Sequence, residues 1–276
     1  MTDAILTAHN LVKTYHQRSG RFGLSTSQVT ALENVSVTLR RGTTLAVVGE
    51  SGSGKSTLAR CLLQLQPLNS GEVFFARAPQ GEMQNLARLD AEHLRAIRKD
   101  LQMVFQDPFA SLNPRMRIGE IVGEGLLVHA MGNRAEQQLK VIAMLERVGL
   151  TEADMQKYPH EFSGGQRQRI GIARALVLNP KVVVCDEPVS ALDVSIQAQI
   201  LLLLKELQAE MALSYIFISH DLRVVRHIAD DIVVMRHGKV VEQGAVEDIY
   251  NRPQEEYTKN LLAAIPGHAA KLQVNG

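Results

Sequence analysis

Short apolar runs alternate with helical patterns from about residue 43 to residue 241. The runs TTLAVVG (43–49), VVVCD (182–186) and SYIFIS (214–219) are almost wholly apolar, which is typical of strands buried on both faces of a sheet. This alternation predicts an α/β fold with a mostly parallel sheet. A further strand is expected at residues 101–106, helices at about 56–65, 163–178 and 195–210, and a hairpin that turns at His237 and Gly238.

The N-terminal segment has a different pattern. Residues 5–15 and 31–42 resemble two strands, and the residues between them, 17–27, form a polar segment rich in Ser, Thr, Gly and Arg. We expect these two strands to pair through a loop at 17–27. The sequence therefore predicts an antiparallel β lobe at the start of the fold.

Strand patterning disappears between Asp107 and about His160. Helical periodicity replaces it, most clearly in AEQQLKVIAMLERVGL (135–150), where Gly149 is expected to end the helix. We therefore predict a helical subdomain, inserted at about residues 107–165, in an α/β domain that spans residues 1–250.

Composition narrows the classes of protein that fit. Lys and Arg (30 residues) nearly balance Asp and Glu (29 residues), so no strong basic field attracts nucleic acid. The only cysteines, Cys61 and Cys185, lie far apart in apolar segments, which fits packing in a reducing compartment better than a disulfide framework. No apolar run approaches the length of a membrane span, and the N-terminus does not resemble a signal peptide.

The first chemical motif is GESGSGKS (49–56), which fits G-x-x-x-x-G-K-[ST] and lies between an expected strand and an expected helix. In such a loop, glycines let the backbone N–H groups converge on phosphate oxygens, helped by the helix N-terminus. Lys55 is expected to reach the β- and γ-phosphates and Ser56 to bind Mg²⁺, with Thr57 near the α-phosphate. A chance match in a glycine-rich turn is the alternative, which the flanking strand and helix disfavour.

A second motif is the pair of acids that ends the apolar run 182–186. Asp186 and Glu187 would lie at the carboxyl edge of a parallel sheet, where ligands bind. There Asp186 could hold Mg²⁺ and Glu187 could polarise a water that attacks the γ-phosphate. Taken alone, a strand that ends in a polar turn explains the pair equally well. The phosphate-loop motif upstream favours the catalytic interpretation.

The segment Phe162-Ser163-Gly164-Gly165-Gln166 resembles the LSGGQ signature of ABC ATPases, with Phe in place of the first Leu. A Ser N-cap followed by glycines is the simpler alternative. The resemblance implies that this loop binds the γ-phosphate of ATP held by a partner subunit, so that two such domains close head to tail around two nucleotides. It also implies a phosphate-loop NTPase core of the ABC type.

Other ABC motifs follow in order along the chain. Tyr15 stands where these ATPases place an aromatic ring against adenine, although an ordinary strand aromatic is the alternative. Gln106 resembles the Q-loop glutamine that contacts Mg²⁺ or the attacking water, and Ser190-Ala191-Leu192-Asp193 resembles the D-loop. His220 resembles the switch histidine that contacts the γ-phosphate and supports Glu187; alone, it would more often be a capping or packing residue.

The resemblance implies an ATP hydrolase that acts through phosphoryl transfer to water. The catalytic residues would be Glu187, His220, Gln106 and Lys55. The Mg²⁺ ligands would be Ser56, Gln106 and Asp186. The nucleotide would be bound by Tyr15, Gly49, Glu50, Ser51, Gly52, Ser53, Gly54, Lys55, Ser56, Thr57, Ser163, Gly164, Gly165, Gln166 and Asp193.

Two further segments resemble one group of these ATPases. The stretch QDPFASLNPR (106–115) and the tail YTKNLLAAIP (257–266) are similar to segments of the dipeptide, oligopeptide and nickel importers. Residues 251–276 would form the tail of that group. Several relatives carry a cysteine cluster for an iron–sulfur centre after this tail; residues 267–276 contain no Cys, so no such cluster is expected.

This resemblance implies an ATPase subunit on the cytoplasmic face of a bacterial inner membrane. Its partners would be a second ATPase subunit, either a paralogue or another copy of itself, two membrane-spanning permease subunits and, indirectly, a periplasmic binding protein. The solute would be a small peptide, with nickel or another metal chelate as the alternative. A soluble ABC ATPase acting on nucleic acid or ribosomes, and a module that binds nucleotide without turnover, fit the residues less well.

Overall fold

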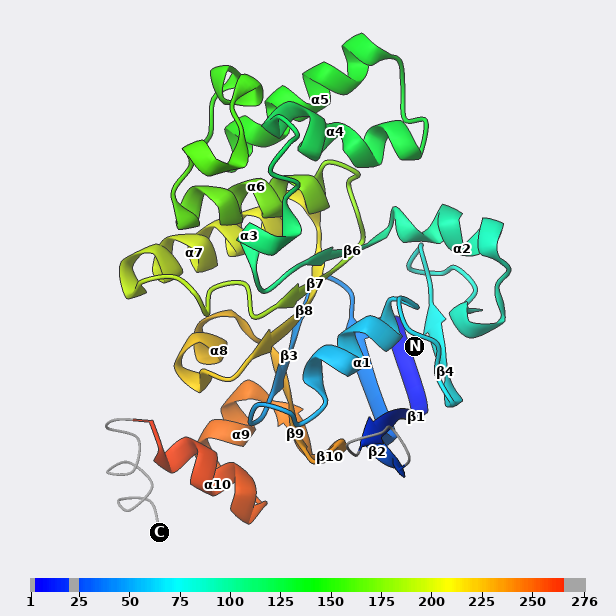
Figure 1. Ribbon diagram of the computed structural model, residues 1–276. Helices are drawn as coiled ribbons and strands as arrows, with labels where there is room; N and C mark the ends of the chain where they lie inside the picture. The colour runs from blue at the N-terminus through cyan, green and yellow to red at the C-terminus, as the bar shows by residue number, and fades with distance from the viewer. Residues whose placement is uncertain (1–2, 20–24, 266–276) are drawn as a thin grey trace. The chain divides into compact units, whose positions relative to one another are not determined.

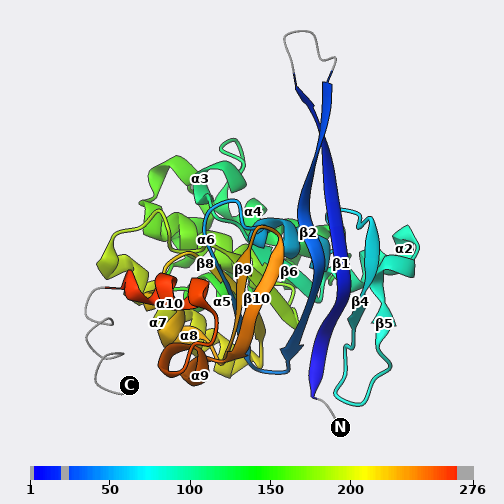
Figure 2. The same ribbon diagram turned by 90° about the horizontal axis from the view of Figure 1, so that it is seen from below.

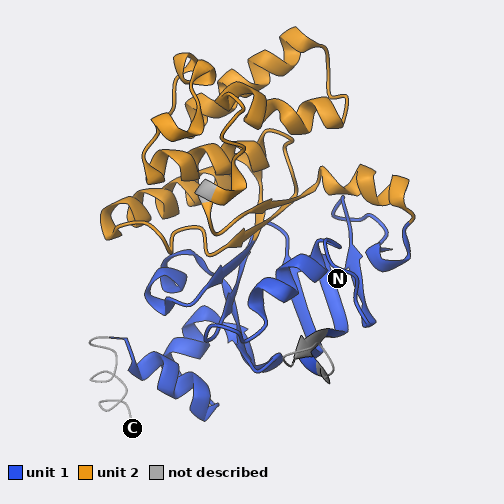
Figure 3. Ribbon diagram, viewed as in Figure 1, with its two compact units in different colours: residues 1–89, 216–276 blue, residues 90–215 orange. Residues whose placement is uncertain are grey.

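The computed structural model describes residues 3–19 and 25–265, with side chains for all of these except residues 16–19, 25–27 and 108–109. The chain divides into two compact units, which Figure 3 colours separately. Unit 1 comprises Met1–Leu89 with Ile216–Gly276, and unit 2 comprises Asp90–Tyr215. Helices and strands occur in both, as the α/β prediction requires.

An antiparallel sheet in the order β2-β1-β4-β5 begins unit 1. Its strands are β1 (Ala4–Ser19), β2 (Ser25–Arg40), β4 (Ser70–Phe75) and β5 (Gln84–Asn85). Figure 2 shows β1 and β2 side by side over their whole length. Leu6, Leu11, Leu32 and Leu39 from these two strands are fully buried, and their burial stabilises the lobe. The predicted antiparallel lobe is confirmed.

The expected loop at residues 17–27 was too long. The backbone of Gln17 pairs with that of Ser27, and Ser19 pairs with Ser25, so the strands continue to both sides of residues 20–24. Residues 20–24 themselves lie outside the described part of the chain. The polar sequence misled the prediction, because an antiparallel pair can carry polar side chains without losing its backbone ladder. The strands β4 and β5 were not predicted at all.

A second set of strands in unit 1 combines segments from both ends of the chain. Strand β3 (Thr44–Val48) runs parallel to β9 (Asp231–Arg236), and β9 pairs antiparallel with β10 (Lys239–Ala245). Every residue of β3 is buried, which explains its unbroken apolar sequence. His237 and Gly238 both have positive φ angles, at 48° and 78°, and form the tight turn expected between β9 and β10.

The helices of unit 1 follow these strands. Helix α1 ends earlier than predicted, because Gln64 adopts a left-handed conformation with φ of 52° and turns the chain out of the helix. The helical elements are α1 (Lys55–Leu62), the 3₁₀ turn η1 (Leu86–Arg88), α8 (Leu222–Ile228), α9 (Val246–Asn251) and α10 (Glu256–Ala263). The segment 257–266 thus begins within a short helix, and its last residue, together with residues 267–276, lies outside the described residues.

Unit 2 contains two parallel strands and most of the described helices, which Figure 1 colours from turquoise through green to yellow. Leu101 pairs with Val182 and Val104 with Cys185. The strands are β6 (Leu101–Val104) and β7 (Val182–Asp186). The helices are α2 (Ala91–Arg98), α3 (Pro108–Ser111), α4 (Ile118–Val128), α5 (Arg134–Arg147), η2 (Glu152–Gln156), η3 (Pro159–Glu161), α6 (Gly164–Leu176) and α7 (Val194–Met211).

Residues 107–165 contain helices and turns without a strand. Helix α4 packs against both α5 and α6. Helix α5 begins at a capping box in which Asn133 and Glu136 exchange hydrogen bonds. It ends where Gly149 takes a φ of 79° and the N–H of Leu150 returns to the carbonyl of Leu145. The expected helix end at Gly149 is therefore confirmed, whereas α2 was not predicted.

Strand β8 (Ser214–Ser219) begins in unit 2 and carries the chain into unit 1. All six of its residues are buried, as the apolar run SYIFIS predicted. Among the described residues, no helix is both long and apolar enough to cross a membrane.

Candidate functional site

The loop between β3 and α1 owes its shape to glycines in conformations that other residues avoid. Gly49, Gly52 and Gly54 have φ angles of 147°, 80° and 107°. A Cβ at Gly49 would lie 2.1 Å from the carbonyl oxygen of Met235, and one at Gly54 would lie 2.4 Å from that of Ala31. Glycine is therefore required at 49 and 54 for steric as well as torsional reasons.

The turn between β9 and β10 supports this loop. The N–H of Gly238 donates to the carbonyl of Ser53 (3.0 Å), and the N–H of Glu33, on β2, donates to the carbonyl of Gly238 (2.8 Å). Residues distant in sequence thus fix the loop from outside. No motif pointed to Met235 or Gly238 as part of the site; the only available signal was the glycine expected at the hairpin turn.

Lys55 is buried beneath the loop, with 5% of its surface exposed. Its Nζ donates to the carbonyls of Gly49 (2.8 Å) and Glu50 (2.7 Å). The Ser53 hydroxyl is also buried, and its oxygen has no hydrogen-bond partner among the described residues. An ammonium and an unsatisfied hydroxyl in one glycine loop fit a bound phosphate, which supplies acceptors for both.

The first turn of α1 adds to this anion site. Ser56 and Thr57 are half-buried there, beside Lys55. The first turn contains no acidic side chain, so nothing opposes the partial positive charge of the helix N-terminus. Gly49 to Thr57 therefore form a continuous loop and helix start that suits the phosphates of a nucleotide.

Tyr15 lies on β1 and is half-buried. Its hydroxyl donates to the side chain of Gln66, and Nζ of Lys13 lies 5.1 Å from the ring centroid, within the range of a cation–π contact. Both contacts are those of an ordinary strand aromatic, and neither identifies a base-binding surface. The role of Tyr15 in holding adenine stays a prediction.

His220 follows β8 and is exposed. The next residue, Asp221, accepts from the N–H of Arg223 (2.9 Å) and forms an ion pair with its guanidinium (2.7 Å). The hydrogen bonds from Arg223 are the main reason that the pKa of Asp221 is lowered, and the nearby charge of His220 adds to the effect. A rigid helix start therefore follows the histidine immediately.

In unit 2, the structure brings together two residues that the sequence separates widely. Nε2 of Gln106 donates to Oε2 of Glu187 at 3.0 Å. Asp186 ends β7 and is 4% exposed, whereas Glu187 is half-exposed and takes a positive φ of 46°. That strained conformation, which is uncommon for a glutamate, turns the chain immediately after the strand. Ser190 stabilises the turn by donating from its hydroxyl to the carbonyl of Glu187 (3.1 Å).

The segment 162–166 forms the N-terminus of α6. The Ser163 hydroxyl accepts from the N–H of Gln166 (3.3 Å), and the Gln166 side chain accepts from the N–H of Ser163 (3.0 Å). This capping box accounts for both residues structurally, so their role in binding nucleotide stays a prediction. Phe162 is buried, and Nζ of Lys157 lies 5.6 Å from its ring.

The two glycines in this segment differ in the space available for a side chain. A Cβ at Gly165 would lie 2.6 Å from Cγ2 of Ile196, at the start of α7, whereas one at Gly164 would meet Leu192 at an ordinary 3.6 Å. Gly165 therefore allows the first turns of α6 and α7 to approach closely. This packing requirement was not apparent from the sequence.

Asp193 caps the N-terminus of α7. Its carboxylate accepts from the N–H of Ile196 (3.0 Å) and the hydroxyl of Ser195 (2.8 Å). The backbone hydrogen bond from Ile196 is the main cause of its lowered pKa. Because its side chain is exposed and negative, Asp193 remains accessible to a partner molecule.

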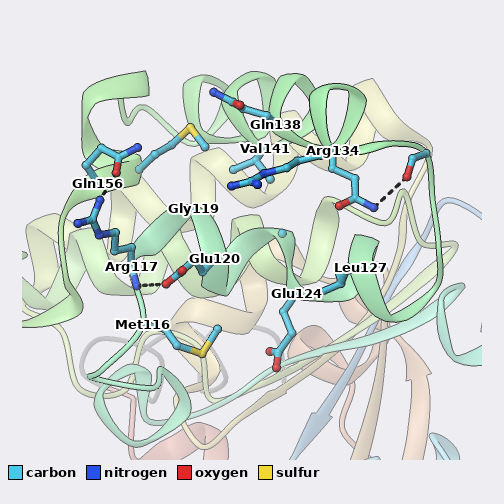
Figure 4. Close-up of a pocket in the computed structure, with 14 residues that line it drawn as sticks. Met116, Arg117, Gly119, Glu120, Glu124, Leu127, Arg134, Gln138, Val141 and Gln156 are labelled. Carbon is cyan, nitrogen blue, oxygen red and sulfur yellow. Dashed lines mark hydrogen bonds between the residues drawn. The ribbon is translucent and has the colours of Figure 1, made fainter.

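A hollow of about 900 Å³ lies on unit 2, over α4, α5 and η2 (Figure 4). Two of its edges are marked by Arg117, whose N–H donates to Glu120 (2.8 Å), and by Leu127, which is 71% exposed. Gly119 and Gly123 on α4 lie against Met155 and Val141, at 3.0 and 3.4 Å from a hypothetical Cβ. Glycines at these two positions therefore let Met155 and Val141 pack close to the backbone of α4.

The His, Cys, Asp and Glu side chains in the described ranges form no group of three that could hold a metal ion by themselves. Mg²⁺ commonly needs fewer protein ligands, because it keeps waters and shares substrate phosphates. Mg²⁺ binds oxygen ligands of the kinds that the hydroxyl of Ser56, the amide of Gln106 and the carboxylate of Asp186 supply.

Comparison with known proteins gives a consistent result. The family model described as ABC transporter matches residues 32–190. The dipeptide transport ATP-binding protein DppF of Haemophilus influenzae is 50% identical over 262 residues, which cover 95% of this chain and 78% of that protein. The glutathione import ATP-binding protein GsiA of Pectobacterium atrosepticum is 49% identical over 264 residues, but the match covers 96% of this chain and only 41% of GsiA.

Solved structures show the same relationship. The dimeric structure of the ATP-binding cassette MJ0796, in a post-hydrolysis state with ADP and phosphate bound, matches with a TM-score of 0.74 and 30% identity. The match covers 88% of this chain and 99% of that chain. The phosphate-loop core with an antiparallel lobe and additional helices is therefore the fold of an ATP-binding cassette.

Proposed function

Because this chain belongs to the ABC transporter family, whose ATP-binding proteins hydrolyse ATP to drive transport, we propose that it powers the uptake of small peptides. The observation that carries this proposal is 50% identity to a dipeptide transport protein over 95% of the chain. The segment 106–115 supports it, because it resembles the same group of importers. A second relative is named for import of glutathione, which is itself a small peptide.

We propose that the loop at 49–57 binds the phosphates of ATP. The positive φ angles of its glycines turn the backbone into a cradle, and the Ser53 hydroxyl and Lys55 ammonium lie within it. Each group gains an acceptor when phosphate enters. Lys55 would stabilise the negative charge that develops on the γ-phosphoryl oxygens during hydrolysis.

We propose that Glu187 orients and polarises the attacking water. Gln106 donates to one carboxylate oxygen of Glu187, which helps to hold the carboxylate in place. Ser56, Gln106 and Asp186 would hold Mg²⁺, which neutralises phosphate charge when it is bound. His220 would contact the γ-phosphate, and Tyr15 would stack on adenine.

We propose that Ser163, Gly164, Gly165, Gln166 and Asp193 act on a nucleotide held by a second ATPase subunit, in a head-to-tail dimer. The dimeric state of the related cassette MJ0796 supports such an assembly. The second subunit would be a paralogue or another copy of this chain. A composite site of this kind is complete only when the dimer closes, which couples hydrolysis to a conformational cycle.

We propose further that the hollow on α4, α5 and η2 receives a segment of a membrane permease subunit. Residues 116–120, which directly follow the importer-like segment 106–115, line part of it, and it is large enough, at about 900 Å³, for several side chains. This chain would then lie on the cytoplasmic face of the inner membrane, and a periplasmic binding protein would deliver the solute to the permeases.

Two leucines provide a matched test of that contact. Leu127 lines the hollow and is 71% exposed, whereas Leu139 is 67% exposed on α5 and does not line it. We expect Leu127→Arg to reduce the amount of permease that copurifies with the chain and Leu139→Arg to leave it unchanged. Equal copurification of both variants would place the contact elsewhere.

The solute is tested with the membrane complex, purified with its binding protein and reconstituted. Phosphate release is measured with a dipeptide, glutathione, a longer peptide and nickel added in turn. The proposal predicts that a peptide stimulates hydrolysis several-fold and that nickel does not. Stimulation by nickel alone would instead identify a metal importer.

A further inference from the structure

The side chain of Tyr257, on the C-terminal helix α10, contacts the phosphate loop. The N–H of Glu50, the second residue of the loop, donates to the hydroxyl oxygen of Tyr257 at 3.2 Å. Because both residues belong to unit 1, the contact lies within one compact part of the chain. The loop motif does not predict it, since Tyr257 lies far away in the sequence and on another element.

This contact acts on the peptide plane that also holds Lys55. The carbonyl of Gly49 and the N–H of Glu50 belong to one planar peptide unit, in which they point in opposite directions. The carbonyl accepts from Nζ of Lys55 at 2.8 Å, and the N–H donates to Tyr257. Lys55 and Tyr257 therefore hold the same peptide plane from opposite sides.

The plane benefits from such a restraint because it follows a glycine. Gly49 has a φ of 147° and no side chain, so its own backbone torsions restrict it less than those of other residues would. A rotation of the Gly49–Glu50 plane would turn the carbonyl away from Lys55. The ammonium would then lose one of the two carbonyls that aim it, the other being that of Glu50 at 2.7 Å.

Tyr257 is itself held in place. The guanidinium of Arg236, at the end of β9, lies 4.8 Å from the centre of its ring, a cation–π contact. On the same helix, Thr258 and Leu262 are buried, with 1% and 0% of their surface exposed. The packing of α10 and the contact between the Tyr257 ring and Arg236 therefore both fix the position of the phenol oxygen.

The start of α10 is also anchored to β10. The carboxylate of Glu242 accepts from the N–H groups of Gln254 (2.8 Å) and Glu255 (3.3 Å). These bonds connect the residues just before α10 to β10, the strand that follows the turn at Gly238 beneath the phosphate loop. A rigid connection therefore runs from β10 through α10 to Glu50.

We propose that Tyr257 is a positioning residue for Lys55: by accepting from Glu50, it fixes the Gly49–Glu50 peptide plane and so aims the lysine at the phosphates of ATP. This inference rests on the proposed phosphate-binding role of Lys55. The tail helix is thereby part of the nucleotide site, although it supplies no group that touches the nucleotide.

A cavity beside the contact determines how a variant should behave. About 390 Å³ of space lies between Glu50, Arg236 and the side chains of α10, and Glu50 is exposed. In Tyr257→Phe, water can therefore bond the freed N–H, while the ring remains over Arg236. We expect little loss of stability, because the N–H is not left unsatisfied, but the orientation of the plane is lost.

The test is an equilibrium titration of the full chain with a non-hydrolysable ATP analogue and Mg²⁺. For Tyr257→Phe we expect the Kd to rise about threefold to tenfold, the effect of losing one hydrogen bond, with the unfolding temperature nearly unchanged. Tyr250→Phe is the matched control: its hydroxyl is buried and donates to the carbonyl of Leu222, so its loss should lower the unfolding temperature and leave the Kd unchanged.

A double variant shows whether Tyr257 acts through Lys55. If it does, Tyr257→Phe should raise the Kd by less than about 1.5-fold in a Lys55→Met background, because the group it positions is gone. An unchanged Kd in the single variant, an equal increase in Tyr250→Phe, or the full increase in both backgrounds would overturn the inference. If Lys55→Met alone left the Kd unchanged, the proposed phosphate site would be wrong instead.

Discussion

Replacing Gly165 with Ala should destabilise the chain, although alanine is the better helix former. The new methyl carbon would lie 2.6 Å from Cγ2 of Ile196, whereas packed carbon atoms lie about 3.5–4.0 Å apart. The first turns of α6 and α7 must therefore separate by about 1 Å. Overpacking of this kind costs about 1–3 kcal/mol, and the alanine recovers about 1 kcal/mol through helix propensity. We expect the free energy of unfolding to fall by about 0–2 kcal/mol.

Gly171 provides the matched control on the same helix. It is buried, but a Cβ there meets no atom within 4 Å. Only the propensity gain remains, so Gly171→Ala should raise the free energy of unfolding by about 0.5–1 kcal/mol. The free energies of unfolding of the two alanine variants should therefore differ by about 0.5–3 kcal/mol, with Gly165→Ala the less stable.

Urea denaturation, monitored by circular dichroism, measures these free energies of unfolding. Adding Ile196→Ala to Gly165→Ala should recover stability beyond the sum of the single effects, because the colliding methyl is removed. If Gly165→Ala were as stabilising as Gly171→Ala, the close approach of α6 and α7 would be refuted. The interpretation of Gly165 as a packing residue would fall with it.

Two further predictions concern thiols and acid stability. Burial raises the pKa of Cys61 to about 11 and that of Cys185 to about 12, so an alkylating reagent at about pH 8 should label both thiols only after unfolding; rapid labelling of the native chain would contradict this. Arg223 lowers the pKa of Asp221 in the folded state. The ionised carboxylate therefore stabilises the fold at pH values above the unfolded pKa of Asp221, about 4. This stabilisation is lost as the pH falls through the folded-state pKa. The stability advantage of the parent chain over Asp221→Asn, measured by urea denaturation, should therefore shrink below about pH 4; an advantage that does not change with pH would contradict the ion pair.

The parts of the fold that the sequence predicted are those fixed by local patterns. The apolar runs at Val182–Asp186 and Ser214–Ser219 gave the bounds of β7 and β8, because strands buried on both faces leave no polar positions. The turn at His237 and Gly238 followed from residues that accept positive φ angles. Local chemistry was sufficient in each case.

The parts that were missed depend on contacts between distant residues. Strand β4 pairs with β1, and β5 pairs with β4; neither β4 nor β5 carries a strong apolar pattern of its own. The carbonyl of Met235 beneath Gly49 and the hydroxyl of Tyr257 beside Glu50 likewise arise only when separate segments pack together. Periodicity reports which face of an element is buried, but not which atoms it meets.

The candidate site shows the same division. The motif predicted that Lys55 lies where a glycine loop meets a helix, but not which two carbonyls hold its ammonium. Gln106 and Glu187 were assigned to one reaction because of their order along the chain, and the structure adds the hydrogen bond between them. The capping box of Ser163 and Gln166 gives those residues a structural role that the signature motif does not reveal.

In the proposed function, this chain hydrolyses ATP for transport with Glu187 beside the attacked phosphate. Glu187→Gln keeps the size of the side chain and an oxygen that can accept from Gln106, but removes the charge that polarises water. Phosphate release and ATP affinity should be measured for this variant in the purified membrane complex. We expect an unchanged ATP affinity and a loss of phosphate release of at least about 100-fold; turnover equal to that of the parent chain would show that Glu187 does not act on the attacking water.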